Sequence, residues 1–139
     1  MTNTKRWLLD TNALIALLRR DHVHHPAVRR WFDEFGRHAW ATCPITQAGF
    51  VRICAAAYGI SQPEARRRLE RGIEHPAHSF WPADVSYSEA ISLLLEPMGH
   101  KQVTDAYLLG LALHHGGQLA TFDKALKIYF GEGVELIAT

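Results

Sequence analysis

Short apolar runs closed by small polar residues alternate along this sequence with longer segments of helical character. The first run, residues 6–9, stops at Asp10 and is typical of a strand buried in a parallel sheet. Residues 13–18 are apolar on all sides, as expected of a helix packed on such a sheet. Similar runs predict further short strands at 39–42, 79–81, 118–121 and 134–137.

The segments between these strands carry helix start and stop signals. Pro26 in the first turn and Gly36 at the end define a helix over residues 25–36, and Pro44 opens another that ends near Gly59. Further helices are predicted at 65–72, after a capping box at Ser61 to Glu64, and at 87–95 and 103–114. Strands that alternate with helices in this way predict an α/β fold, with a parallel sheet covered on both faces.

Length and composition indicate one folded domain. The 139 residues suffice for a single domain over 1–139 with its own core, and 47% hydrophobic with 21% charged residues excludes disorder for most of the chain. Fifteen Lys and Arg against 14 Asp and Glu give a net charge of +1. There is no overall basic surface, so any contact with nucleic acid has to be local.

The cysteines and the apolar runs predict a cytoplasmic protein without membrane contact. Cys43 and Cys54 are too few for a disulfide framework and fit a reducing compartment. Residues 1–9 hold only a three-residue apolar run, which is unlike a signal peptide. No apolar run approaches the roughly 18 residues that a membrane span needs.

Three aspartates occupy positions at which α/β folds commonly bind ligands. Asp10 and Asp123 each follow a predicted strand and precede a helix, and ligands of such folds bind beyond the carboxyl ends of the strands. Asp105 lies in the first turn of the helix that leads to the strand before Asp123. Carboxylates held this close repel one another, and a hard divalent cation such as Mg²⁺ or Mn²⁺ is the usual compensation. A carboxylate-bound ion of this kind is suited to phosphoryl transfer.

Each aspartate also has a purely structural interpretation. Asp10 and Asp105 are well placed to cap helices, and Asp123 is a typical turn residue. For any one of them alone, capping is the commoner use of Asp before a helix. Two at the ends of neighbouring strands favour a shared site.

Four ordered segments span nearly the whole chain: Leu8 to Asn12, Thr42 to Arg52, Val103 to Leu108, and Leu119 to Asp123. In this order and spacing they resemble the PIN-domain ribonucleases, and more narrowly the VapC-type toxins of toxin–antitoxin pairs. The resemblance implies a three-layer α/β/α sandwich around a short, mostly parallel sheet, and endonucleolytic cleavage of RNA. It also implies a small antitoxin protein as partner and a homodimer.

The same resemblance assigns roles to individual residues. It implies that Asp10, Asp105 and Asp123 bind Mg²⁺ or Mn²⁺ and are catalytic, and that Asn12 and Thr121 position them. In the mechanism we expect, the ion held by these residues would lower the pKa of a water for in-line attack on the scissile phosphorus, so no histidine or serine nucleophile is needed.

One position departs from the family pattern. The family has a glutamate early in the helix after the second strand, where this chain has Gln47. An amide hydrogen-bonds a metal-bound water but adds no charge, which leaves a site of formal charge −3 instead of −4. This departure keeps open the alternative of an inactive PIN module that only binds RNA or protein.

A phosphatase or phosphotransferase with Asp10 as covalent nucleophile is a further alternative. Enzymes of the haloacid dehalogenase kind have a second aspartate two residues later, and this chain has Asn12 there. That difference argues against such an activity.

Most of the histidines and aromatic residues are expected to be structural. His22 and His25 lie one helical turn apart, but no third ligand at suitable spacing supports a zinc site. The pair at 114–115 suits the negative end of a helix dipole. Trp31, Phe32 and Phe35 recur at helical spacing and are predicted to be core, with a partner surface as the alternative.

Two groups of arginines are candidates for contact with RNA. Those at 66, 67, 68 and 71 lie among two glutamates and are predicted to form a solvated helix face, with contact to the RNA backbone as the alternative. Arg19, Arg20 and Arg52 are expected nearer the mouth of the aspartate crevice.

Overall fold

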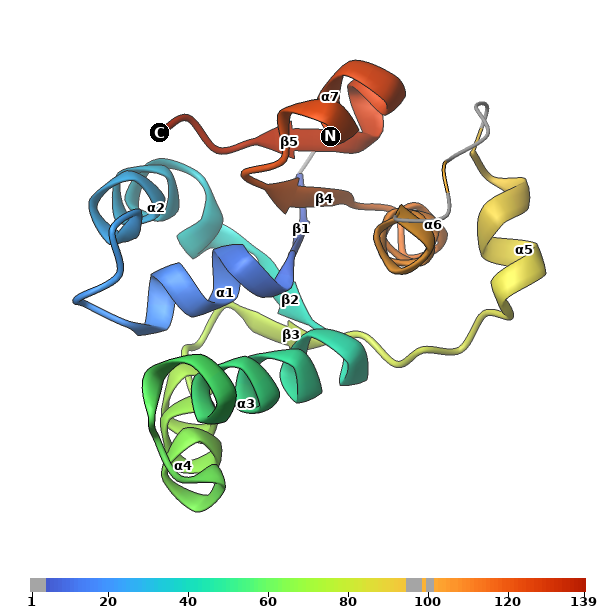
Figure 1. Cartoon of the computed structure of the whole chain (residues 1–139). Coiled ribbons are helices and arrows are strands. Elements are labelled where there is room, and N and C mark those ends of the chain that lie inside the picture. The colour runs from blue at the N-terminus through green and yellow to red at the C-terminus, as the bar shows by residue number, and fades with distance from the viewer. Residues whose placement is uncertain (1–4, 95–98, 100–101) are drawn as a thin grey trace.

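The computed structural model describes residues 5–94, 99 and 102–139, and within them five short strands form one parallel sheet (Figure 1). The strand order is β3-β2-β1-β4-β5, and every neighbouring pair is parallel. The strands are β1 (Trp7–Leu9), β2 (Trp40–Thr42), β3 (His78–Phe80), β4 (Gln118–Thr121) and β5 (Val134–Leu136). The predicted α/β class with a parallel sheet is confirmed.

Helices cover both faces of this sheet, which gives the three-layer α/β/α sandwich (Figure 1). The helices are α1 (Thr11–Leu18), α2 (His25–Glu34), α3 (Pro44–Tyr58), α4 (Gln62–Gly72), α5 (Tyr87–Ser92), α6 (Val103–His114) and α7 (Lys124–Phe130). Two 3₁₀ turns, Gly36–His38 and Gly131–Gly133, precede β2 and β5.

The core is divided by the sheet into two clusters, because successive side chains of a strand point to opposite faces. Trp7 and Leu9 of β1 pack with α1, α2, α3 and α4, whereas Leu8 packs with α5, α6 and α7 on the other face. Trp31 and Phe32 are 7% and 4% exposed and belong to the first cluster, as predicted for core residues. The prediction was wrong for Phe35, which is 42% exposed because it follows the end of α2.

Several boundaries differ from the predicted ones by one to three residues, for local reasons, whereas α6 and β4 have their predicted ranges. α1 begins at Thr11 because the Asp10 side chain accepts a hydrogen bond from the Thr11 N–H. Ser61 caps α4 by accepting from the Glu64 N–H at 3.2 Å. The Glu64 carboxylate accepts from Arg67 and Arg68 rather than completing the predicted capping box. The predicted end of the helix over 87–95 lies outside the described residues.

Pairing between the central strands β1 and β4 determines which residues lie next to each other at the candidate site. Leu9 pairs with Ala120, and the Asp10 N–H donates to the Ala120 carbonyl at 2.9 Å. The residues that follow the two strands therefore leave the sheet side by side at its carboxyl end.

Cys43 and Cys54 are buried and form no disulfide. Within the described ranges, none of the helices combines the length and the apolar character that a bilayer crossing requires.

Candidate active site

A crevice of about 390 Å³ lies at the carboxyl ends of β1 and β4 and brings the three predicted aspartates together. Besides Asp10, Asp105 and Asp123, it is lined by the predicted positioning residues Asn12 and Thr121. The remaining lining residues are Thr11, Arg52, Ile53, Thr104, Leu108 and Phe122.

Asp10 is the most buried of the three acids, with 8% of its surface exposed. One carboxylate oxygen accepts from the Thr11 N–H at 2.7 Å, and the other accepts from the Thr121 hydroxyl at 2.8 Å. Burial raises the pKa of Asp10, the two hydrogen bonds lower it, and the charge of Asp123 raises it. Asp10 therefore caps a helix and also presents its carboxylate to the crevice.

Thr121 connects Asp10 to Asp123. Its hydroxyl accepts from the Asp123 N–H at 3.1 Å while donating to Asp10. Asp123 in turn caps α7, since its Oδ1 accepts from the N–H groups of Ala125 and Leu126 at 2.9 and 3.2 Å. These contacts fix the position of both carboxylates before any ligand arrives.

Asp105 projects from the first turn of α6 and is half-buried. Its pKa is raised to about 6, first by burial and then by the negative charges of Asp10 and Asp123. The three carboxylates thus interact electrostatically across the crevice, and a divalent cation relieves this repulsion.

The donor set of the crevice fits a hard cation that keeps some of its water. Carboxylate, amide and hydroxyl oxygens are the groups that Mg²⁺ and Mn²⁺ prefer. The three carboxylates are more widely spaced than in a closed cage: among the described residues, the one group of three ligating side chains within 4.8 Å of each other lies elsewhere. Mg²⁺ is usually held by few carboxylates and several waters, so this spacing suits it.

Gln47 is not among the residues that line the crevice. Its side-chain amide donates to the Thr42 hydroxyl at 2.9 Å. α3 reaches the crevice with Arg52 and Ile53, and a Cβ on Gly49 would lie 2.9 Å from the Thr11 side chain. Because each residue turns a helix by 100°, positions 47 and 49 point in nearly opposite directions. α3 contains no acidic residue and adds no carboxylate to the site.

Of the three arginines expected near the crevice, only Arg52 lines it. Arg19 and Arg20 line a different pocket of about 860 Å³ together with Arg68 and Arg71. Arg19 is 8% exposed, pairs with Asp21 at 2.9 Å and packs over the Tyr58 ring. The direction of α1 carries its C-terminal end away from the aspartates.

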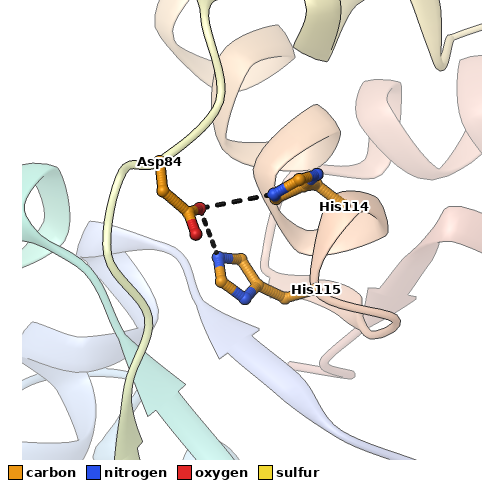
Figure 2. Close-up of side chains that lie close together, drawn as sticks. All are labelled: Asp84, His114 and His115. Carbon is orange, nitrogen blue, oxygen red and sulfur yellow. Dashed lines mark hydrogen bonds and ion pairs between the residues drawn. The ribbon is translucent and has the colours of Figure 1, made fainter.

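The two groups of histidines make different contacts in the structure. The Nδ1 atoms of His22 and His25 contact local backbone, the His24 N–H and the Ala16 carbonyl respectively. His114 and His115 instead face Asp84, which precedes α5 (Figure 2). No sequence signal joins Asp84 to this pair, because they are about 30 residues apart and meet only in the fold.

Comparison with known proteins decides the family. The model of the PIN domain family matches residues 7–129. The chain belongs to the PIN domain family. A PIN relative, ribonuclease VapC44 of Mycobacterium tuberculosis, is 44% identical and aligns with 88% of this chain and 89% of its own length.

Two solved structures share the PIN fold at low sequence identity. VapC20 of Mycobacterium tuberculosis, described as a toxin that cleaves the sarcin–ricin loop, has a TM-score of 0.70 at 13% identity, covering 95% of this chain and 99% of that one. A toxin–antitoxin complex from Klebsiella pneumoniae has a TM-score of 0.62 at 18% identity, covering 94% and 97%. These likenesses concern the fold.

Proposed function

We propose that this PIN-domain protein is an endoribonuclease of the VapC kind, which hydrolyses RNA phosphodiester bonds as the toxin of a toxin–antitoxin pair. The observation that carries the proposal is the meeting of Asp10, Asp105 and Asp123 in one crevice at the carboxyl end of the sheet. The 44% identity to a ribonuclease VapC over most of the chain supports the same activity. Both favour an enzyme over an inactive binding module.

Asp10, Asp105 and Asp123 would hold Mg²⁺ or Mn²⁺. When bound there, such an ion supplies Lewis acidity and lowers the pKa of a coordinated water toward neutrality. Burial, together with the charges of Asp10 and Asp123, raises the pKa of Asp105 to about 6 and so disfavours three charged carboxylates without a cation.

The other crevice residues act on Asp10 and on the substrate. Thr11 and Thr121 hold the two oxygens of Asp10, so its orientation is set before RNA binds. Arg52 is the cationic side chain of the crevice lining, and its guanidinium is suited to a phosphate oxygen of the RNA backbone. Asn12, exposed at the start of α1, is placed to hydrogen-bond a water or a phosphate oxygen.

The proposed partners are a small antitoxin and a second copy of the chain. Exposed apolar side chains on α7 favour association: Ile128 and Tyr129 are 82% and 55% exposed. The aromatic residues in and just after α2 offer less, since Trp31 and Phe32 are buried and only Phe35, which follows α2, is exposed. Because the proposed substrate is RNA, we propose that the protein acts in the cytoplasm.

An RNA cleavage assay tests the activity. The purified chain is incubated with a labelled mixture of structured RNAs in Mg²⁺, in Mn²⁺ and in excess EDTA. We expect discrete cleavage products that EDTA abolishes and that Asp123→Asn prevents. Asp33→Asn, an exposed aspartate of α2 paired with Arg29, is the matched control and keeps full activity. Cleavage that survives EDTA, or that Asp123→Asn leaves unchanged, would refute the proposed site.

Light scattering on protein eluting from a size-exclusion column tests whether the chain forms a dimer and binds an antitoxin. We expect twice the monomer mass for the chain alone. Co-expression with the small open reading frame next to its gene should yield a complex without ribonuclease activity. A monomer that such a neighbour neither binds nor inhibits would refute this part of the proposal.

A further inference from the structure

A second group of ligating side chains lies at the C-terminal end of α6 (Figure 2). Asp84, in the connection between β3 and α5, points its carboxylate at His114 and His115. One carboxylate oxygen lies 3.0 Å from the Nε2 of His115 and 3.4 Å from the Nε2 of His114. One ligand atom of each residue falls within 4.8 Å of the other two.

These spacings match the edges of a tetrahedral metal site. With metal–ligand bonds of about 2.0–2.1 Å, neighbouring ligand atoms of a tetrahedral Zn²⁺ lie about 3.3 Å apart. The two distances from the Asp84 oxygen to the imidazole nitrogens fall on either side of that value. A small movement of the half-exposed Asp84 and His114 side chains would therefore suffice to admit an ion.

The surroundings hold His115 and the Asp84 connection in place. The His115 ring stacks on the buried Trp81 ring, with centroids 5.2 Å apart and planes 16° apart. Its Nε2 also lies 3.1 Å from the Pro82 carbonyl, a hydrogen bond that Zn²⁺ would replace because it binds the same nitrogen. The Tyr107 hydroxyl donates to the Val85 carbonyl at 2.7 Å, which ties the residue after Asp84 to α6. A site with fixed ligands loses little conformational entropy when an ion binds.

We propose that Asp84, His114 and His115 form a Zn²⁺ site that is separate from the aspartate crevice. Two imidazoles and one carboxylate are a donor set typical of Zn²⁺, whereas Mg²⁺ prefers oxygen alone. The partial exposure of Asp84 and His114 leaves the fourth position open to water. Asp105 and His114 are nine residues apart on α6, which separates the two sites by about 13 Å along the helix.

An ion bound here would join the connection before α5 to the helix that carries Asp105. The proposal does not depend on the nuclease activity, because it concerns metal binding at the opposite end of α6. A free hydrogen-bonded cluster that takes no ion is the competing interpretation, and the experiment separates the two.

The test is a Zn²⁺ titration by calorimetry on protein without a histidine tag. All proteins carry Asp10→Asn and Asp123→Asn, so that the crevice does not compete for the ion. We expect one equivalent of Zn²⁺ to bind, with affinity at least tenfold weaker in His114→Ala and in Asp84→Asn. Co²⁺ in place of Zn²⁺ should give the intense visible absorption of a tetrahedral site, and both substitutions should remove it.

Two control variants test whether histidines outside the cluster contribute to Zn²⁺ binding. His38→Ala changes an exposed histidine outside the cluster, and His22→Ala changes the group near the start of α2. Both should bind Zn²⁺ as tightly as the parent. Thermal melting without metal establishes that each variant is folded. The proposal is overturned if the parent takes up no Zn²⁺, if His114→Ala and Asp84→Asn bind it unchanged, or if His22→Ala abolishes binding.

Discussion

The two ends of α6 present different ligand chemistry. At its N-terminal end, Asp105 joins two other carboxylates in a crevice whose polar lining offers oxygen donors and one guanidinium. At its C-terminal end, two imidazoles face a single carboxylate. One helix thus places oxygen donors suited to hard cations at one end and imidazole donors suited to borderline cations at the other, since the residue types at each end decide which ion is favoured.

Substitutions at the two ends of α6 should affect RNA cleavage differently. This difference in cleavage rate is the largest effect we expect. Asp10→Asn removes a charge from the crevice and should lower RNA cleavage at least about a hundredfold, because the ligand set for the catalytic ion is broken. His114→Ala should leave cleavage at saturating Mg²⁺ unchanged. Initial rates on one labelled RNA measure both.

The Asp10→Asn protein should remain folded and melt at the same temperature or slightly higher, since an amide relieves the burial of a charge. Comparable loss of cleavage in both variants would mean that the two ends of α6 serve a single function.

Arg52 tests whether the crevice end also contacts the RNA backbone. Arg52→Ala should lower kcat/KM roughly tenfold, mainly through KM, because a charge-assisted hydrogen bond to phosphate is lost. The salt dependence of binding should weaken by about 0.7 in log–log slope. The matched control is Arg66→Ala, which removes an exposed guanidinium paired with Glu70 on α4. Equal effects of the two substitutions would assign Arg52 only a general electrostatic role.

The raised pKa of Asp105 predicts a pH-dependent stability difference. Between its ordinary pKa of 3.8 and its folded value of about 6, folded protein holds a proton that unfolded protein releases. Folding stability from this group is therefore lost as pH rises through that window. Asp105→Asn in EDTA should melt on the order of 2 °C above wild type at pH 7.5, discounted for partial exposure, and show no gain near pH 4.

The measurement is the difference in Tm between variant and wild type at each pH. This difference cancels the opposite contribution of His22 and His78, whose pKa values are lowered by burial. A gain that does not vary with pH would show that neither burial nor the neighbouring carboxylates raise the pKa of Asp105.

The smallest effect we expect is a difference in Mn²⁺ affinity between substitutions at Gln47 and at Asn12. Gln47→Glu should leave the Mn²⁺ dissociation constant within about twofold of wild type, because Gln47 contacts Thr42 outside the crevice. Asn12→Asp adds a carboxylate to the crevice lining and should tighten Mn²⁺ binding several-fold. Calorimetric titration of both variants with Mn²⁺ measures these dissociation constants. Tighter binding by Gln47→Glu would return that residue to the site and restore the family pattern that the sequence suggested.

Local signals were sufficient to predict the elements and the three aspartates. Apolar runs ending at Asp10 and Asp123 identify strands, and parallel strands bring their carboxyl ends together without further information. Asp105 follows from the position of its helix before β4. The resemblance to PIN domains added Thr121, whose hydroxyl does contact Asp10.

The errors came from the direction in which helices present their side chains. A sequence shows that Gln47 lies early in a helix, but two residues of offset decide whether it faces the crevice or Thr42. Arg19 and Arg20 follow an apolar helix whose course in space is set by packing, and they reach another pocket. Asp84 meets His114 and His115 through contacts between distant segments, which no local pattern encodes.

Both edges of the sheet are strands of only three residues, β3 and β5. A free edge with so few N–H and C=O groups offers little template for another strand, so the fold is protected against edge-to-edge aggregation without a covering element. For the same reason, self-association that extends the sheet across two copies would gain few hydrogen bonds. Any dimer of this chain should be built from helix surfaces, and substitutions at the sheet edges should leave its assembly unchanged.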